Sequence, residues 1–251
     1  MQKIQLINPM DNAKLYRYPQ GNITQLFGEN PNLYAFMNLK GHNGWDIYMP
    51  YGTPVRAVCR ARVVDIKEDP TGFGKHVRII TDLIDDYYYE ITFGHLSEIK
   101  TKVGNWVIAG DIIGLCGNTG FVVSGGTAYW KGYNPDNKGT HLHIGIRKLT
   151  VPKSGYNSAI ISYPLDKYGY NVEDYNNGMK GAIDPLPFFE DEIKRQAVSL
   201  IELVKRFIAE FSNFMKNKFT GTANSTPEAI LSNIPKVAIK VKKGRKLTKR
   251  K

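Results

Sequence analysis

Short segments rich in β-branched residues, separated by turns, occupy the chain from about residue 50 to residue 118. Partial alternation of apolar and polar side chains marks three of them, TPVRAVCRARVVDIKED, KHVRIITD and YYYEITFGHL. The intervening DPTGFG and DLIDD have compositions typical of turns. Strands of this length and spacing indicate an antiparallel sandwich or barrel-like domain. The sequence therefore predicts a mainly β fold with a compact antiparallel β-sheet or sandwich domain.

The composition changes after residue 187, where one long amphipathic segment begins. We expect a C-terminal helix over residues 188–219, with acidic residues leading and lysines ending it, as the helix dipole favours. Its apolar stripe packs on the β domain, forms a coiled coil with a second copy, or docks on another partner. The stripe follows alternating steps of four and three residues and consists of Ile193, Ala197, Leu200, Val204, Phe207, Phe211 and Phe214, widened by Ile201, Ile208 and Met215.

Positive charge is concentrated at the end of the chain. Nine of the eleven net positive charges lie in residues 236–251, which contain no acidic residue. We interpret residues 220–251 as a linker and basic tail, which is either a solvated end or an electrostatic tether to a polyanion. Teichoic acid, anionic lipid and nucleic acid are all candidates, because such a tail binds anions with little specificity.

Four of the five histidines are candidates for chemistry. His141 and His143 share one face of a predicted strand, because alternate side chains of a strand point the same way. The pair could hold a metal, could divide metal binding and proton transfer between them, or could be exposed surface residues. His42 lies four residues before Asp46 in HNGWD, where Gly44 would let the backbone bend so that both side chains converge.

Imidazole and carboxylate groups are ordinary zinc ligands, and HLH offers a third ligand to join His42 and Asp46. His95 lies at a predicted strand end, whereas His76 has no polar partner for chemistry nearby in sequence and is expected at the surface or in strand packing. The chain has no H-E-x-x-H motif, which excludes the common helical zinc-protease arrangement. A metal site here would be built on strands.

Four motifs in order, GHNGWD, FGHLS, VGNWVIAGDIIGLCGNTG and THLHIGIR, closely resemble the lysostaphin/LytM-type zinc endopeptidases of bacterial cell walls. The resemblance covers roughly residues 15–150. It implies a compact antiparallel β domain with a groove across it. It also implies that His42, Asp46 and His143 hold zinc, while His141 and His95 assist the attack of a metal-activated water on the scissile carbonyl.

Residues that would contact substrate are less constrained by this resemblance. Tyr34 lies where the family often places groove aromatics. About twenty residues intervene before HLH where the family often has a short turn, and they include Tyr129 and Trp130. We expect this aromatic loop, residues 119–139, to form a groove wall.

We therefore expect a zinc-dependent endopeptidase that cleaves peptide bonds in peptidoglycan stem peptides or cross-bridges. The alternatives are a non-catalytic LytM-like wall-binding module and a virion structural module. The expected organisation is an N-terminal extension (1–14), a zinc peptidase β domain (15–187), the amphipathic helix (188–219), and the linker with its basic tail (220–251).

The N-terminal sequence has no apolar signal core, and no later run is long enough to span a membrane. We expect a protein made in soluble form without a signal peptide that acts on the bacterial cell wall. Delivery would then follow a bacteriophage route, either release from the host cytoplasm as an endolysin or carriage on a virion. The helix 188–219 is the candidate surface for virion attachment or self-association.

Overall fold

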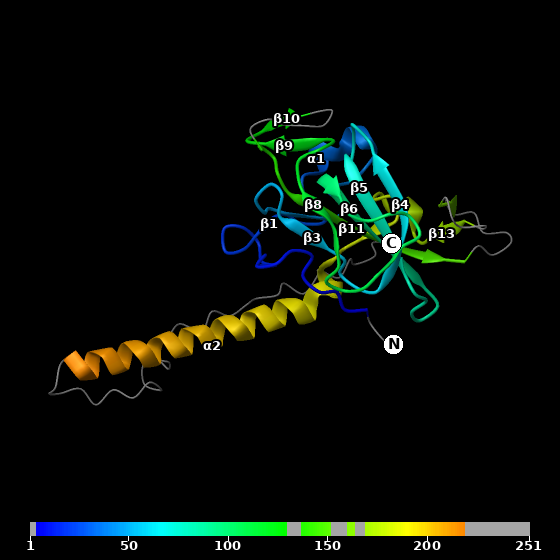
Figure 1. Cartoon of the computed structure of the whole chain (residues 1–251). Coiled ribbons are helices and arrows are strands. Elements are labelled where there is room, and N and C mark those ends of the chain that lie inside the picture. Colours follow the sequence, from blue (N-terminus) through cyan, green and yellow to red (C-terminus); the bar gives the residue numbers. More distant parts are fainter. Residues whose placement is uncertain (1–3, 130–136, 152–159, 164–168, 219–251) are drawn as a thin grey trace, which may run out of the picture. The chain divides into compact units, whose positions relative to one another are not determined.

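The computed structural model describes residues 4–129, 137–151, 160–163 and 169–218, and Figure 1 shows the path of the chain. The chain divides into two units, residues 1–196 and residues 197–251. The first unit contains the β domain, and the second contains the C-terminal part of a long helix.

Strands form the framework of the first unit where the structure describes it. Those of the first half of the chain are β1 (Ile23–Gln25), β2 (Trp45–Ile47), β3 (Pro54–Arg56), β4 (Ala61–Glu68), β5 (Lys75–Thr81), β6 (Tyr88–Ile99), β7 (Trp106–Val107) and β8 (Ile112–Cys116). The later strands are β9 (Val122–Ser124), β10 (Thr127–Tyr129), β11 (Leu142–Thr150), β12 (Ile160–Ile161), β13 (Tyr170–Val172) and β14 (Ala182–Ile183). The helical elements are α1 (Pro31–Tyr34), η1 (Ala35–Met37), η2 (Tyr175–Asn177) and α2 (Leu186–Lys218).

The strands pair antiparallel in one large sheet, in the order β1-β2-β11-β6-β5-β4-β7. Strand β8 bridges β3 and β6, β13 and β14 pair with β11, and β9 and β10 form a separate hairpin. The mainly β, antiparallel fold predicted from the sequence is confirmed, as is the long C-terminal helix. Strand β11 lies between β2 and β6, so residues from three distant parts of the sequence meet along it.

The main core lies under this sheet and extends beyond the strands. It includes Leu6, Met10 and Ala13, which belong to the segment before residue 15. It also includes Phe188 and Phe189 from the first turn of α2. The segment before residue 15 and the start of α2 therefore both contribute side chains to the core of the β domain.

Helix α2 begins within the first unit, where Gln196 bonds to the backbone of Leu15 and Ala13. Residues 197–218 are the described part of the second unit, and along them Val198, Phe207 and other large apolar side chains are exposed. Within the described chain, no helix has the length and apolarity needed to cross a membrane.

Candidate metal centre

Two neighbouring strands bring three potential metal ligands together. His143 in β11 lies opposite Asp46 in β2, and His42 lies just before β2. The His42 Nε2 atom is 3.0 Å from both Asp46 Oδ1 and His143 Nδ1, and the last two atoms are 3.1 Å apart. All three side chains are buried. Pairing of β2 with β11 therefore turns two short motifs, about 100 residues apart, into one ligand group.

The glycine between His42 and Asp46 is required for space. A Cβ atom on Gly44 would lie 2.4 Å from the Ile144 carbonyl oxygen and 2.7 Å from the His143 ring. The sequence predicts that Gly44 lets the backbone bend, but Gly44 is not among the residues with positive φ. The close approach of the HNGWD segment to β11 is thus the reason that no side chain fits there.

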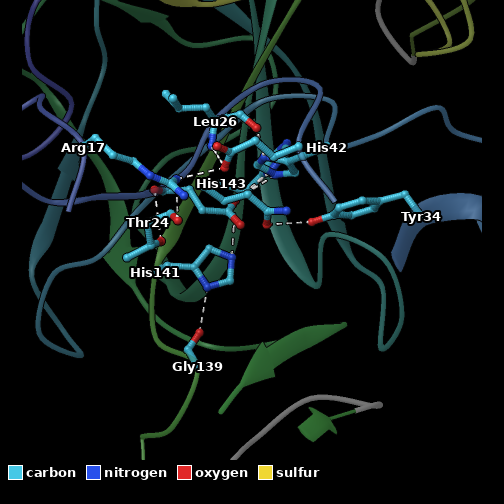
Figure 2. Close-up of polar contacts among 11 residues, drawn as sticks. Arg17, Thr24, Leu26, Tyr34, His42, Gly139, His141 and His143 are labelled. Atoms are coloured by element: carbon cyan, nitrogen blue, oxygen red, sulfur yellow. Dashed lines mark hydrogen bonds and ion pairs between the residues drawn. The ribbon is translucent and has the colours of Figure 1, made fainter. Parts of the chain in front are cut away.

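A hydrogen bond on the far side of the His42 ring determines which of its nitrogens faces the site. The Nδ1 atom of His42 is 3.3 Å from the Leu26 carbonyl oxygen, as Figure 2 shows. Since a carbonyl only accepts, Nδ1 carries the proton and Nε2 keeps its lone pair toward Asp46 and His143. His143 uses Nδ1 instead, and its buried Nε2 has no hydrogen-bond partner among the described residues.

The two remaining candidate histidines lie beside the triad. The Nδ1 atoms of His141 and His95 donate to the carbonyls of Gly139 and Thr119, each at 2.7 Å. Each Nε2 atom therefore keeps a lone pair. The His141 Nε2 atom is 3.5 Å from Asp46 Oδ1, and the His141 and His95 ring centroids are 4.5 Å apart.

The backbone of His95 is itself unusual. Its φ is 60°, a left-handed conformation that a residue with a Cβ atom adopts only when its surroundings enforce it. A hydrogen bond from the His95 amide to the Phe73 carbonyl oxygen, at 2.7 Å, is one such constraint. The strain at this position supports a functional reason for the orientation of the His95 ring.

The electrostatics of the site favour deprotonated ligands. Burial alone would raise the pKa of Asp46, but the neighbouring His141, His42 and His143 rings hold this pKa well below its usual value. Burial lowers the pKa of His143 to about 4. Burial, with His141 and His143 nearby, also holds the pKa of His95 well below its ordinary value. Near neutral pH Asp46 is therefore an anion and His143 is neutral, which are the states that bind a metal ion.

The arrangement fits zinc. Zinc bonds of about 2.0–2.2 Å in tetrahedral geometry place neighbouring ligand atoms about 3.3 Å apart. The separations of 3.0–3.1 Å between the His42, Asp46 and His143 ligand atoms are close to this value. Two imidazoles and one carboxylate leave a fourth position open, as in catalytic zinc sites. The zinc ligand group predicted from the sequence is confirmed as a buried triad.

Residues 40–155 match the model of peptidase family M23, and this range contains all five residues of the site. This chain carries an M23 peptidase domain. Lysostaphin of Staphylococcus simulans is 36% identical over 80 residues, which are 32% of this chain and 16% of lysostaphin. The glycyl-glycine endopeptidase ALE-1 of Staphylococcus capitis is 35% identical over 85 residues, 34% of this chain and 23% of ALE-1. The solved structure of LytU is similar with a TM-score of 0.44 and 28% identity, covering 72% of this chain and 95% of LytU. This chain thus spans less than a quarter of the length of the two sequence relatives.

The triad of the M23 domain opens into a cavity of about 660 Å³. Tyr34 lines this cavity, stacks on His42 with 5.4 Å between ring centroids, and donates a hydrogen bond to Gln25 Oε1 at 2.9 Å. Of the other two predicted substrate contacts, Trp130 and the side chain of Tyr129 lie outside the described residues. The described start of the aromatic loop contributes Phe121 and its neighbours to the cavity wall.

Two further cavity residues were missed in the sequence. The ring centroids of Phe73 and His143 lie 4.8 Å apart, although the segment DPTGFG by itself predicts only a turn. An aromatic residue between two glycines was the available signal. Gln25 lies opposite Asp46 in the β1–β2 pair, and its Nε2 atom is buried without a partner among the described residues. No local pattern marks Gln25, because its position depends on strand pairing.

Proposed function

We propose that the M23 domain is a zinc-dependent endopeptidase that hydrolyses peptide bonds in the stem peptides or cross-bridges of peptidoglycan. The observation that carries this proposal is the convergence of three buried ligand atoms beside two histidines that keep Nε2 lone pairs. The match to a peptidase family supports the reaction class. The description of ALE-1 as a glycyl-glycine endopeptidase supports peptide cross-bridges as a substrate class.

His42, Asp46 and His143 would hold the zinc ion, which when bound supplies Lewis-acid polarisation of the scissile carbonyl and lowers the pKa of water. The chain's own contribution is to keep these ligands deprotonated and fixed in direction. Asp46 is an anion because its histidine neighbours outweigh the effect of burial on its pKa. Burial of all three side chains also limits the access of bulk water to the site.

Proton transfer falls to His141 and His95. Peptide hydrolysis requires a water to lose a proton as its oxygen attacks the carbonyl carbon, and the amine to gain one as the C–N bond breaks. The Nε2 atom of His141 is free to take the first proton, because its Nδ1–H is engaged by the Gly139 carbonyl. With its ring 4.5 Å from that of His141, His95 assists in stabilising charge or returning the proton to the leaving amine.

Tyr34 is proposed to contact the substrate. Burial, with Asp46 nearby, raises the pKa of Tyr34 above its ordinary value, so the hydroxyl keeps its proton. A protonated hydroxyl at the cavity wall can donate to a substrate oxygen in place of Gln25. Tyr129 and Trp130 are proposed as further substrate contacts on the loop before HLH.

The remaining expectations concern the whole chain. We propose that the basic residues of 220–251 attach the enzyme to a polyanion, and that helix 188–219 joins a second copy or a virion. Use by a bacteriophage as an endolysin or virion enzyme remains part of this proposal.

Mass spectrometry of fragments released from purified peptidoglycan tests the function. Wild-type protein should release peptide fragments with new amino termini, and a zinc chelator should abolish this release. The variant His141→Ala, loaded with zinc, should release almost none. If zinc-loaded wild-type protein releases no fragment from several wall types, the endopeptidase proposal fails in favour of a wall-binding or structural module.

A further inference from the structure

We propose that Arg17 and Glu29 are positioning residues for the metal ligand His42, and that they raise the affinity of the site for zinc. They act through the backbone of Leu26, and we call this pair the Arg17–Glu29 clamp. The inference rests on the proposed function only in taking zinc as the metal.

The clamp begins at one carboxylate oxygen. Glu29 Oε2 accepts a hydrogen bond from the Leu26 amide at 2.9 Å and lies 2.9 Å from Arg17 Nη1. The same Arg17 nitrogen donates to the Thr24 carbonyl at 2.6 Å. Figure 2 labels Arg17, Thr24 and Leu26 and draws these contacts as dashed lines. The Arg17–Glu29 ion pair thereby connects both ends of residues 24–29. Within this segment, the Leu26 carbonyl contacts the metal ligand His42.

The same loop holds His42 at three points. Its ring Nδ1 lies 3.3 Å from the Leu26 carbonyl, its amide donates to the Glu29 carbonyl at 2.9 Å, and its carbonyl accepts from the Gly28 amide at 2.8 Å. The side chain and the backbone of His42 are thus both held in place by residues 26–29. A shift of this loop would rotate the ring as well as displace it.

The loop and the segment that carries the ligand His42 also pack closely against each other. A Cβ atom on Gly41, the residue before His42, would lie 2.5 Å from the Gly28 carbonyl oxygen. The two backbones are therefore in direct contact. Loop geometry and ring orientation are coupled through this contact as well as through the hydrogen bonds.

The consequence concerns metal affinity more than stability. An Arg17 side chain 47% exposed and a Glu29 side chain 33% exposed form a pair that contributes little to folding in water. Partners that orient a ligating histidine, in contrast, typically change metal affinity about 10–100-fold. Both clamp residues precede residues 40–155, so the metal centre depends on a segment outside the part of the chain that matches the family.

Zinc dissociation constants, measured by competition with a chelating dye on the full chain, test the clamp. Glu29→Ala should weaken zinc binding about tenfold. Glu29→Gln, which keeps an acceptor for the Leu26 amide, should recover part of this loss, and Arg17→Gln should show a smaller loss than Glu29→Ala. The matched control is Asp11→Asn, which removes the partner of Arg56 in an exposed ion pair that does not touch the metal loop. The melting temperature of each metal-free variant shows whether folding has changed.

The clamp is supported if zinc affinity falls in the order given while the melting temperatures of the metal-free variants stay close to wild type. It is overturned if Glu29→Ala binds zinc as tightly as wild type, or if Asp11→Asn weakens binding as much. If Glu29→Ala is too unstable to measure, unchanged zinc affinity in Arg17→Gln overturns the proposal by itself. These outcomes are independent of hydrolysis, so a wild-type protein that binds zinc without cleaving peptidoglycan would refute the proposed function alone.

Discussion

The two polar ends of strand β11 differ in how their charges are matched. Toward the end of the strand, Arg147 makes two hydrogen bonds to Glu90, at 2.7 and 2.6 Å, and Glu90 is only 1% exposed. Burial acts to lower the pKa of Arg147, but Glu90 raises it, so Arg147 keeps its charge. At the start of the strand, His143 meets Asp46 and His42, and three electron-rich atoms face one another.

This difference separates a structural site from a ligand site. Burying charge is tolerated when the chain supplies the opposite charge with good geometry, as Glu90 does for Arg147. The triad at His143 lacks such a matching cation among the residues that the structure describes, and an added metal ion completes it. We therefore expect substitutions in the triad to lower activity more than stability. Substitutions in the Arg147–Glu90 pair should lower stability more than metal binding.

Asp46→Asn should have the largest effect on activity. It removes the ligand charge while keeping the shape of the side chain. Losing several kcal/mol of metal-dependent transition-state stabilisation corresponds to about a 1,000-fold fall in kcat/KM. The metal-free variant should be somewhat less stable than wild type, because the low pKa of Asp46 means that its charge is favoured in the folded chain. Rates of peptidoglycan fragment release and the melting temperatures of metal-free proteins check both parts. A variant that retains hydrolysis would refute the triad.

Glu90→Gln should have the opposite outcome. It leaves the partly buried Arg147 charge without its buried partner and should lower the free energy of unfolding by about 3–5 kcal/mol. Zinc binding should persist in the folded variant, because Glu90 does not touch the triad. Denaturant unfolding measures the loss, and Glu98→Gln on the same strand is the control, since its pair with Lys100 is exposed and should matter by less than about 1 kcal/mol. Equal effects of the two substitutions would contradict the comparison.

His141→Ala separates proton transfer from metal binding at the triad. It should lower kcat about 100-fold or more, the usual contribution of a general base. Zinc stoichiometry should stay at the wild-type value, because the ligands are His42, Asp46 and His143. Steady-state hydrolysis of a defined cross-linked peptide, with metal analysis of the same sample, checks this expectation. Loss of zinc in this variant would make His141 a ligand instead.

The smallest effect concerns His76, a buried histidine outside the triad. Burial, with Arg78 nearby, lowers its pKa from the ordinary 6.5. The unfolded chain therefore takes up the proton first, so the contribution of His76 to stability is present above pH 6.5 and is lost as pH falls below it. Unfolding curves of wild type and His76→Gln between pH 7.5 and pH 5 should converge as the pH falls. A constant difference across this range would contradict the sign of the shift.

Local patterns in the sequence predicted two pairs of candidate residues, and the family resemblance selected His42, Asp46 and His143 as the ligands. Alternation in HLH predicts that His141 and His143 share a face, and the HNGWD spacing predicts that His42 and Asp46 approach each other. That these two motifs meet depends on β2 pairing with β11, which the family resemblance implied and no local pattern shows. The contact between the Phe73 and His143 rings likewise depends on a turn folding over the sheet.

The segment before residue 40 shows the limit of such reading. Arg17 and Glu29 are twelve residues apart, in no regular pattern, and become partners only because the chain turns back between them. The segment before residue 15 includes Leu6 and Met10, which are buried in the core. Apolar residues in a short irregular segment carry no periodicity, so their burial follows only from the packing of the complete domain.

Calorimetric titration of zinc into metal-free protein tests the central claim most directly, because it measures metal binding at the triad without any substrate. The account predicts one zinc ion per chain for wild type and for folded Glu90→Gln, and none at the same concentrations for His143→Ala. A wild-type protein that takes up no zinc, or a His143→Ala variant that binds it as wild type does, would contradict the assignment of this site as a zinc centre.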